Sequence, residues 1–405
     1  MKVKVTSGEE FSWNSDTIHA LGLYRTLGRA LGIWPLNYFD IFSYIRVAFI
    51  AIIQLWMSID LTHQLLIKGN CGAVTELVDV LTLITCGILT AAKVIILKIY
   101  EHNVYIIVSS AVEDWTNVTD EKSRRAMLKY AKIGRTVFII QMIGAYTAGF
   151  LLIFTRLTFI TALWSDPTNS SIIRQVPIGP SCWLSSDLSA YNYAICYIIQ
   201  SIQLFVVCTG YNGSDTYFFG IAMHVCGQFE SLHMSIENFD KIKDNVNRRH
   251  EIIKFSKRHK HLLVLADNFE QTYNIIIFVQ VGADTILICI SGIVLLISLQ
   301  ARNFMIVSEL VIRTYLVYVQ LFMYSYVGEK LSEQAQKLQD AIYKISWYNM
   351  APDLVRDMSF IIMRCNYPFS LTAGKVCVMN LSNFKNIIKA MGSYFSMLRL
   401  MFTDD

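Results

Sequence analysis

Seven long apolar stretches set the strongest limit on what this chain can fold into. A helix of roughly 20 residues crosses the hydrocarbon core of a membrane, which is about 30 Å thick. Soluble domains carry about a quarter charged residues, whereas only 16% are charged here. We therefore predict an all-α membrane protein with seven transmembrane helices. These helices are expected near residues 37–60, 72–97, 132–160, 189–212, 272–298, 304–327 and 378–401.

The residues before the first apolar stretch do not resemble a cleavable signal. Charged side chains such as Glu9, Asp16 and Arg25 interrupt them, and a signal peptide needs an unbroken apolar core. The first membrane helix is therefore expected to target the chain. The nine cysteines show no Cys-x-x-Cys pair and no zinc-like spacing, so no metal site is predicted.

Lys and Arg are distributed unevenly between alternate loops. The amino-terminal segment and the second, fourth and sixth loops are rich in basic residues, whereas the first, third and fifth loops offer one each, Lys68, Arg174 and Arg302. Cytoplasmic loops retain basic residues, so the amino terminus is predicted in the cytoplasm and the carboxyl terminus outside. The basic residues lie in separate loops and form no single face, which argues against nucleic acid as a partner.

This orientation makes predictions about covalent modification. The sequon at Asn169 falls in an extracellular loop and should carry sugar, whereas the sequon at Asn117 falls in a cytoplasmic loop and should not. Cys71 and Cys182 both fall outside, where a disulfide can form, although pairing cannot be deduced from sequence.

Ionisable residues inside the apolar stretches need partners, because a lone charge in the bilayer centre costs a few kcal/mol on insertion scales. Asp284 and Arg313 lie near the middle of the fifth and sixth stretches and are expected to pair in an antiparallel hairpin. Glu309, one turn before Arg313, is a rival partner. Lys93 lies in the cytoplasmic half of its stretch and is expected to reach the membrane surface with its long side chain.

A series of short motifs gives the chain a family resemblance. The motifs are Ala30-Leu31-Gly32-Ile33-Trp34-Pro35, Tyr326-Val327-Gly328-Glu329-Lys330-Leu331, Ala341-Ile342-Tyr343, Trp347-Tyr348, Pro352, Pro368, Leu371-Thr372-Ala373-Gly374 and Ser393-Tyr394-Phe395-Ser396-Met397-Leu398-Arg399. Together with the predicted cytoplasmic amino terminus, they resemble the amino-terminal and carboxyl-terminal signatures of insect odorant receptors.

The resemblance implies an odorant-gated, non-selective cation channel and not an enzyme, with no cofactor. It implies a heterotetramer with the shared olfactory co-receptor in the plasma membrane, in the dendritic cilia of olfactory sensory neurons. The long fourth-loop insertion of the co-receptor looks absent, so the chain resembles the odour-tuning subunit. Its partners would be a small volatile odorant, permeating cations, the lipid bilayer and the co-receptor.

The resemblance also divides the chain into functional segments. Residues 1–36 form a cytoplasmic amino-terminal segment, and residues 37–327 form the first six membrane helices. Residues 328–377 form a cytoplasmic anchor helix and loop, and residues 378–405 form the pore-lining helix with a short extracellular tail. Apolar residues alternate four and three apart along the anchor, which indicates a helix seam. This seam either covers the chain's own helices or joins subunits. Its residues are Leu331, Ala335, Leu338, Ile342 and Ile345.

The pore is expected along the last apolar stretch. Ser393, Met397 and Met401 share one helix face at steps of four, and Leu400 lies beside them. Apolar side chains in a ring can close a pore by excluding water, and by resemblance the constriction falls on Met397 and Met401. Ordinary packing is the alternative role for these methionines.

The ligand pocket is expected in the outer halves of the membrane helices. A volatile apolar ligand gains free energy by leaving water for an aromatic cavity, and tyrosine adds a polar group to such a wall. Plain helix packing is the alternative for each candidate. The candidates are Tyr146, Phe150, Phe154, Tyr193, Tyr197, Tyr315 and Tyr318.

Other seven-helix and membrane proteins fit less well. A G-protein-coupled receptor would have the opposite orientation and an acidic-Arg-aromatic triplet where this chain has Thr155-Arg156-Leu157. Gustatory receptors share the topology but usually end on Thr-Tyr, not Ser393-Tyr394, and remain an alternative. A secondary transporter would show two similar halves, and a membrane enzyme would need convergent titratable residues; the sequence shows neither.

Overall fold

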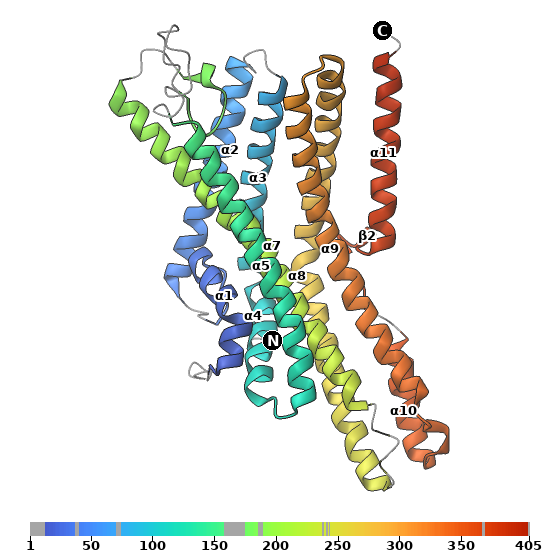
Figure 1. Ribbon diagram of the computed structural model, residues 1–405. Coiled ribbons are helices and arrows are strands. Elements are labelled where there is room, and N and C mark those ends of the chain that lie inside the picture. The colour runs from blue at the N-terminus through green and yellow to red at the C-terminus, as the bar shows by residue number, and fades with distance from the viewer. Residues whose placement is uncertain are drawn as a thin grey trace.

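The computed structural model describes residues 13–36, 40–69, 74–157, 175–184, 189–236, 239, 242, 244–366 and 369–403. Most of these residues are helical, and the long helices run side by side (Figure 1), which confirms the all-α class. Within the described residues, six helices are long and apolar enough to cross a membrane. They are α2 (Ile41–Lys68), α3 (Val74–Ile99), α5 (Glu121–Thr155), α7 (Ala190–Ile236), α8 (Asn245–Gln300) and α9 (Phe304–Lys344).

The remaining elements are shorter. The seventh expected helix is α11 (Leu381–Thr403), which carries Lys385, Lys389 and Arg399 and is not among these six helices. We call the end of the molecule that holds the C-terminus the upper end and the end that holds α10 the lower end, as they lie in Figure 1. The other elements are α1 (Ser15–Leu31), α4 (Glu101–Asn117), η1 (Ser181–Trp183), η3 (Trp347–Asn349), α10 (Pro352–Cys365), β1 (Thr372–Ala373) and β2 (Cys377–Val378), the two strands being antiparallel.

Helices α7 and α8 extend far beyond the apolar stretches that predicted them. The expected end of the fourth stretch was residue 212, but α7 continues to Ile236, and its residues 213–229 are all buried. Phe218 in this part stacks on Phe269 of α8, with ring centroids 5.2 Å apart. Other helices surround this part of α7. Tertiary packing therefore stabilises it, although the hydropathy pattern did not predict it.

The amino-terminal helix α1 is held at the side of the helix bundle by capping and charge. The Asn14 side chain caps α1 by accepting from the Thr17 amide at 2.7 Å. Arg124 at the start of α5 donates to Asp16 at 2.6 Å. This hydrogen bond, with the attraction of the guanidinium, lowers the pKa of Asp16 against the opposing effect of its burial.

The apolar seam after residue 328 lies on α9, which continues without a break from the membrane region to Lys344. Leu331, Leu338 and Ile342 of the seam are at most 1% exposed and belong to the same core as Leu354 and Met358 of α10. The seam therefore covers the chain's own helices, and these three side chains are not available to a partner subunit.

Gly328 marks the point where α9 passes the start of the last segment. A Cβ atom at this position would collide with the carbonyl oxygen of Met379, just before α11. The glycine in the Tyr326–Leu331 motif therefore allows close approach of two backbones.

Candidate functional site

A cavity of about 180 Å³ lies near the upper end, between α3, α5, α9 and the turn at residues 177–180. Its walls combine aliphatic and ionic side chains. Such a mixture is typical of small-molecule sites, in which apolar surface supplies affinity and a few polar groups fix orientation. The lining residues are Glu76, Asp79, Val80, Thr82, Leu83, Leu152, Arg156, Pro177, Gly179, Pro180 and Arg313.

The ionic groups of this cavity pair in a way that differs from the sequence prediction. Arg313 pairs with Asp79 of α3 and, at 2.6 Å, with Glu309 one turn earlier on α9. The predicted pair with Asp284 is wrong, whereas the rival partner Glu309 is confirmed. Asp284 lies 18 residues before Arg302 in the α8–α9 turn, but Arg313 lies only 11 residues after it. At 1.5 Å per residue the two side chains differ in depth by about 10 Å.

One carboxylate oxygen beside the cavity has no donor among the described residues. Glu76 Oε2 is buried and accepts no hydrogen bond from the described residues. Arg156 does not approach it as an ion-pair partner and donates instead to the carbonyl oxygens of Val176, at 3.3 Å, and Gly179, at 3.0 Å. A buried acceptor without a donor costs about 1–3 kcal/mol, so this cavity favours a ligand that can donate a hydrogen bond.

The seven aromatic side chains predicted to bind the ligand do not line this cavity. On α5, Phe150 is 64% exposed and stacks on Phe154, which is also exposed, on the outside of the bundle. Tyr146 shares a hydrogen bond of 3.1 Å with Thr209 and stacks on Phe205. Three aromatic residues at steps of four form one helix stripe, and here most of that stripe faces outward.

The tyrosines of α7 and α9 are also placed elsewhere. The Tyr193 hydroxyl donates to the carbonyl oxygen of Gln175 at 2.6 Å, and the Tyr197 hydroxyl donates to that of Ile153. These bonds tie α7 to the neighbouring loop and to α5. Tyr315 is 64% exposed, and Tyr318 is half-buried on the same helix.

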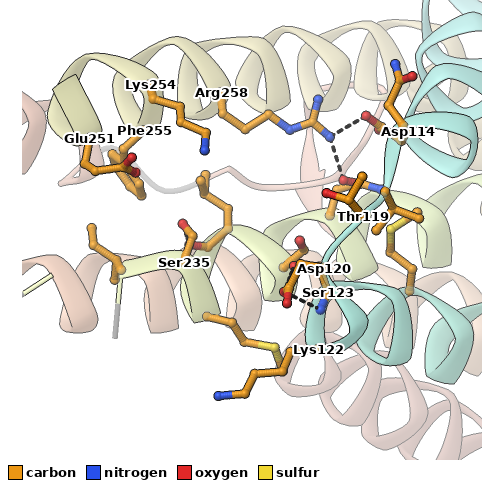
Figure 2. Close-up of a pocket in the computed structure, with 18 of the residues that line it drawn as sticks. Asp114, Thr119, Asp120, Lys122, Ser123, Ser235, Glu251, Lys254, Phe255 and Arg258 are labelled. Atoms are coloured by element: carbon orange, nitrogen blue, oxygen red, sulfur yellow. Dashed lines mark hydrogen bonds and ion pairs between the residues drawn. The ribbon is translucent and has the colours of Figure 1, made fainter. Parts of the chain in front are cut away.

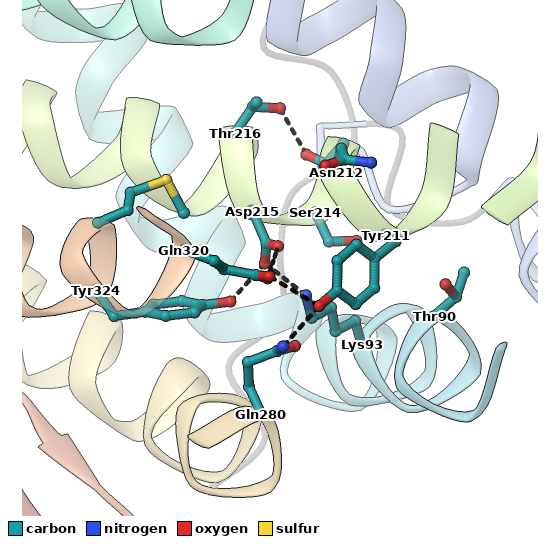
Figure 3. Close-up of polar contacts among 12 residues, drawn as sticks. Thr90, Lys93, Tyr211, Asn212, Ser214, Asp215, Thr216, Gln280, Gln320 and Tyr324 are labelled. Carbon is teal, nitrogen blue, oxygen red and sulfur yellow. Dashed lines mark hydrogen bonds and ion pairs between the residues drawn. The ribbon is translucent and has the colours of Figure 1, made fainter. Parts of the chain in front are cut away.

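A network of largely buried polar side chains lies deeper, where α3, α7, α8 and α9 meet (Figure 3). Its centre is an ion pair of 2.6 Å between Lys93 and Asp215, with both residues at most 3% exposed. Tyr324 and Gln320 of α9 donate to the same carboxylate at 2.5 and 2.6 Å. The expectation that Lys93 reaches the membrane surface is wrong, because Asp215 binds its ammonium group in the interior.

The network continues towards α8. The Tyr211 ring lies 3.9 Å from the Lys93 ammonium, and its hydroxyl donates to Gln320 at 2.8 Å. Gln280 donates to the Tyr211 hydroxyl at 2.6 Å and to Asp284 at 2.9 Å. The predicted end of the fourth stretch at residue 212 excluded Asp215, so sequence reasoning missed the centre of the network. A polar residue directly after an apolar stretch was the available signal.

The predicted pore residues lie on α11, which stands beside α8 and α9 in Figure 1. A Cβ on Gly292 of α8 would contact Phe395, at 3.5 Å, so this side of α11 packs on the bundle. Ser393 and Met397 are exposed, Met397 by 61%. The side chains of Leu400 and Met401 lie outside the described residues, so their positions stay predictions.

The residues predicted for glycosylation and for a disulfide lie only in part within the described residues. Asn169 and Cys71 lie outside the described residues. Cys182 is disulfide-bonded, in agreement with an expected role in a bridge. Asn117, the sequon expected to remain unmodified, is the last residue of α4 at the lower end.

A larger cavity of about 660 Å³ opens at the lower end, between α4, α5, α7 and α8 (Figure 2). Arg258 donates to Asp114 at 2.7 Å and to Gln228 at 2.5 Å across its rim. Its lining carries three cations and three carboxylates and is therefore close to neutral. These residues are Lys122, Lys254, Arg258, Asp114, Asp120 and Glu251.

Several known proteins are similar to this chain. A family profile described as 7tm Odorant receptor matches residues 73–392. Odorant receptor 10 of Aedes albopictus is 22% identical over 233 residues, 57% of this chain and 61% of that protein. Odorant receptor 83a of Drosophila melanogaster is 26% identical over 153 residues, 38% of this chain and 34% of that protein. These matches cover less than two thirds of the relatives' lengths.

A co-receptor and a solved structure are also similar. The odorant receptor coreceptor of Aedes aegypti is 24% identical over 146 residues, 35% of this chain and 29% of that protein. The structure of the insect olfactory receptor OR5 from Machilis hrabei in complex with eugenol superposes with a TM-score of 0.74 at 15% identity. The superposition covers 96% of this chain and 100% of that chain, so the two proteins share a fold.

Proposed function

The chain belongs to the 7tm odorant receptor family, and on that premise we propose that it is the odour-binding subunit of a ligand-gated cation channel. The family match over residues 73–392 is the observation that carries this proposal. The presence of several helices that can each cross a membrane agrees with this proposal. We place the protein in the plasma membrane of olfactory sensory neurons, in their dendritic cilia, with the upper end outside.

The proposed odorant site is the cavity near the upper end. Three of the membrane helices converge there, and Val80, Leu83 and Leu152 offer apolar contact beside the ionic groups. The volume of about 180 Å³ limits the ligand to a small molecule. Glu76 Oε2, which has no donor among the described residues, favours an alcohol or an amine over an ester of similar size, because an ester cannot donate a hydrogen bond.

We propose that the buried polar network transmits ligand binding to the pore. Helices α3 and α9 supply walls of the cavity and also meet in the network, through Lys93 on α3 and Gln320 on α9. Helix α9 in turn contacts α11. A ligand that binds the open arrangement more tightly would shift the closed–open equilibrium, and movement of α9 would be transferred to α11.

The proposed pore follows the face of α11 that bears Ser393 and Met397. This face does not pack on α8, in contrast to the side that bears Phe395. Four such helices around a symmetry axis would form a narrow apolar ring. We propose that the other subunits are the co-receptor, as the resemblance implies.

Recording cation currents from cells that express this chain with the co-receptor tests the channel proposal. Odour-evoked current should appear with both chains and should survive block of G proteins. The variant Met397→Cys should make that current sensitive to a charged thiol reagent, whereas Phe395→Cys, on the packed side of α11, should not. Equal sensitivity of the two variants would refute the proposed pore face, and loss of current under G-protein block would refute the channel mechanism.

An odour panel on the same cells tests the proposed ligand site. Glu76→Gln should weaken responses to small alcohols or amines by about tenfold, since a hydrogen bond to a charged group contributes roughly 1.5–3 kcal/mol. Phe150→Ala, on the exposed stripe of α5, is the matched control and should leave the responses unchanged. If Phe150→Ala weakened the responses and Glu76→Gln did not, the ligand would bind at the aromatic stripe of α5 that the sequence predicts.

A further inference from the structure

A second groove at the lower end has a strongly basic lining. It measures about 630 Å³ and lies between the start of α5, the end of α7 and the part of α9 beyond the membrane region. Lys122, Arg125 and Lys129 line it from α5 and Lys337 lines it from α9, against one carboxylate, Glu230. The lining therefore carries a formal charge of +3. The neighbouring cavity in Figure 2 shares Lys122 but is neutral, so of these two cavities the basic groove is the one suited to a polyanion.

The single carboxylate of the groove is already engaged. Tyr130 donates its hydroxyl to Glu230 at 2.7 Å, and Lys129 lies 3.3 Å from the other carboxylate oxygen. Gln334 of α9, which is buried, donates to the Tyr130 hydroxyl at 2.9 Å. These bonds join α5, α7 and α9 beneath the groove and fix its floor before any ligand arrives.

The cations at the rim can turn towards a ligand at little cost. Lys337 pairs with Glu333 at 2.7 Å and Arg125 pairs with Glu121 at 3.0 Å, and all four side chains are at least 35% exposed. Exposed ion pairs of this kind contribute about 1 kcal/mol or less. Within the described chain, the Lys122 ammonium group forms no hydrogen bond or ion pair. A ligand with several phosphates can therefore recruit Lys122, Arg125 and Lys337 together.

We propose that this groove binds a polyphosphate group, carried by a membrane lipid headgroup or by a soluble inositol phosphate. Phosphate oxygens accept several charge-assisted hydrogen bonds at once, which suits lysines that converge from two helices. The groove lies just beyond the apolar part of α5, on the side that the basic loops place in the cytoplasm, where such headgroups occur. The ligand would bridge α5 and α9 and so bias the helix that continues to α10.

Binding measurements on the purified full-length chain test this proposal without any odorant. The soluble probe is inositol hexakisphosphate, and the membrane probe is a lipid nanodisc containing phosphatidylinositol 4,5-bisphosphate. A phosphatidylserine nanodisc of equal total charge serves as reference. Lys122→Gln, Lys129→Gln and Lys337→Gln in one variant should weaken binding roughly a hundredfold, since each basic residue near such a headgroup contributes about a factor of five.

A matched variant controls for loss of charge. Lys254→Gln, Lys257→Gln and Lys260→Gln remove the same charge from α8, outside this groove, and should leave binding unchanged. Lys129→Arg should also retain it, which separates a charge requirement from a folding defect. Preference for the nanodisc would identify a lipid headgroup as the source, and preference for the soluble probe would identify a free polyphosphate. The proposal would be overturned if the two triple variants lost equal affinity, or if neither polyphosphate probe bound more tightly than the phosphatidylserine nanodisc. Tighter binding of a phosphoserine peptide than of both probes would overturn it as well.

Discussion

Removal of Asp215 should be among the most damaging single substitutions in this protein. Its carboxylate accepts from Lys93, Gln320 and Tyr324 within 2.5–2.6 Å, at the junction of α3, α7 and α9. Asp215→Asn keeps the size of the side chain but removes its charge. The Asn oxygen can still accept a hydrogen bond from Lys93, but the ammonium group loses its adjacent carboxylate. It keeps the Tyr211 ring, 3.9 Å away, in a site that solvent does not reach.

The expected loss follows from the burial of both groups. Breaking a buried ion pair by neutralising one partner costs about 3–5 kcal/mol, because the other charge stays buried without compensation. Lys93→Met should cost a similar amount, since it leaves the carboxylate with two neutral donors. The double variant removes both charges, so its loss of stability should be smaller than the sum of the two single losses. The difference should be about 2 kcal/mol or more.

Unfolding of the purified chain in detergent micelles, followed for all three variants and the parent, measures these differences. The same cycle applied to odour-evoked current shows whether the network also couples the cavity to the pore. Additive losses in the double variant would refute the reasoning, because they would mean that the two charges do not compensate each other. A loss below about 1 kcal/mol for Asp215→Asn would refute it as well.

Three further predictions address close packing, acid sensitivity and orientation. Gly328→Ala should destabilise the fold by about 2 kcal/mol or more through overpacking, whereas Gly282→Ala, with open space around it, should be neutral or gain up to about 1 kcal/mol of helix stability; equal thermal unfolding of the two variants would contradict the clash. The pKa of Asp16 is lowered in the folded state, so its contribution to docking of α1 is present above its ordinary pKa near 4 and is lost as the pH falls below that value. Hydrogen exchange of α1 should therefore differ between the parent and Asp16→Asn at neutral pH and converge in acid, and a difference that persists in acid would exclude this ion pair as the cause. Glycosidase treatment should shift the mobility of the parent but not of Asn169→Gln, and sugar on Asn117 instead would invert the proposed orientation.

The hydropathy pattern was sufficient to predict the class of fold and the approximate places of the membrane helices. Lipid imposes a length and an apolar composition on each crossing helix, and both requirements are local properties of the chain. Six of the seven stretches coincide with helices able to cross a membrane, and the seventh coincides with α11. The short motifs also predicted the family, because they report common ancestry directly and need no knowledge of packing.

The contacts between side chains, in contrast, depend on how the helices pack and did not follow from the sequence pattern. The sequence placed Arg313 opposite Asp284, but an offset of a few residues along neighbouring helices brings it to Asp79. It likewise left open which way the aromatic stripe of α5 faces, and Phe150 proves to lie on the outside. Helical periodicity fixes which residues share a face, whereas the rotation and axial shift of each helix depend on contacts with helices far away in the chain. Those two quantities decide ion pairs and cavities, so a single sequence does not reveal them.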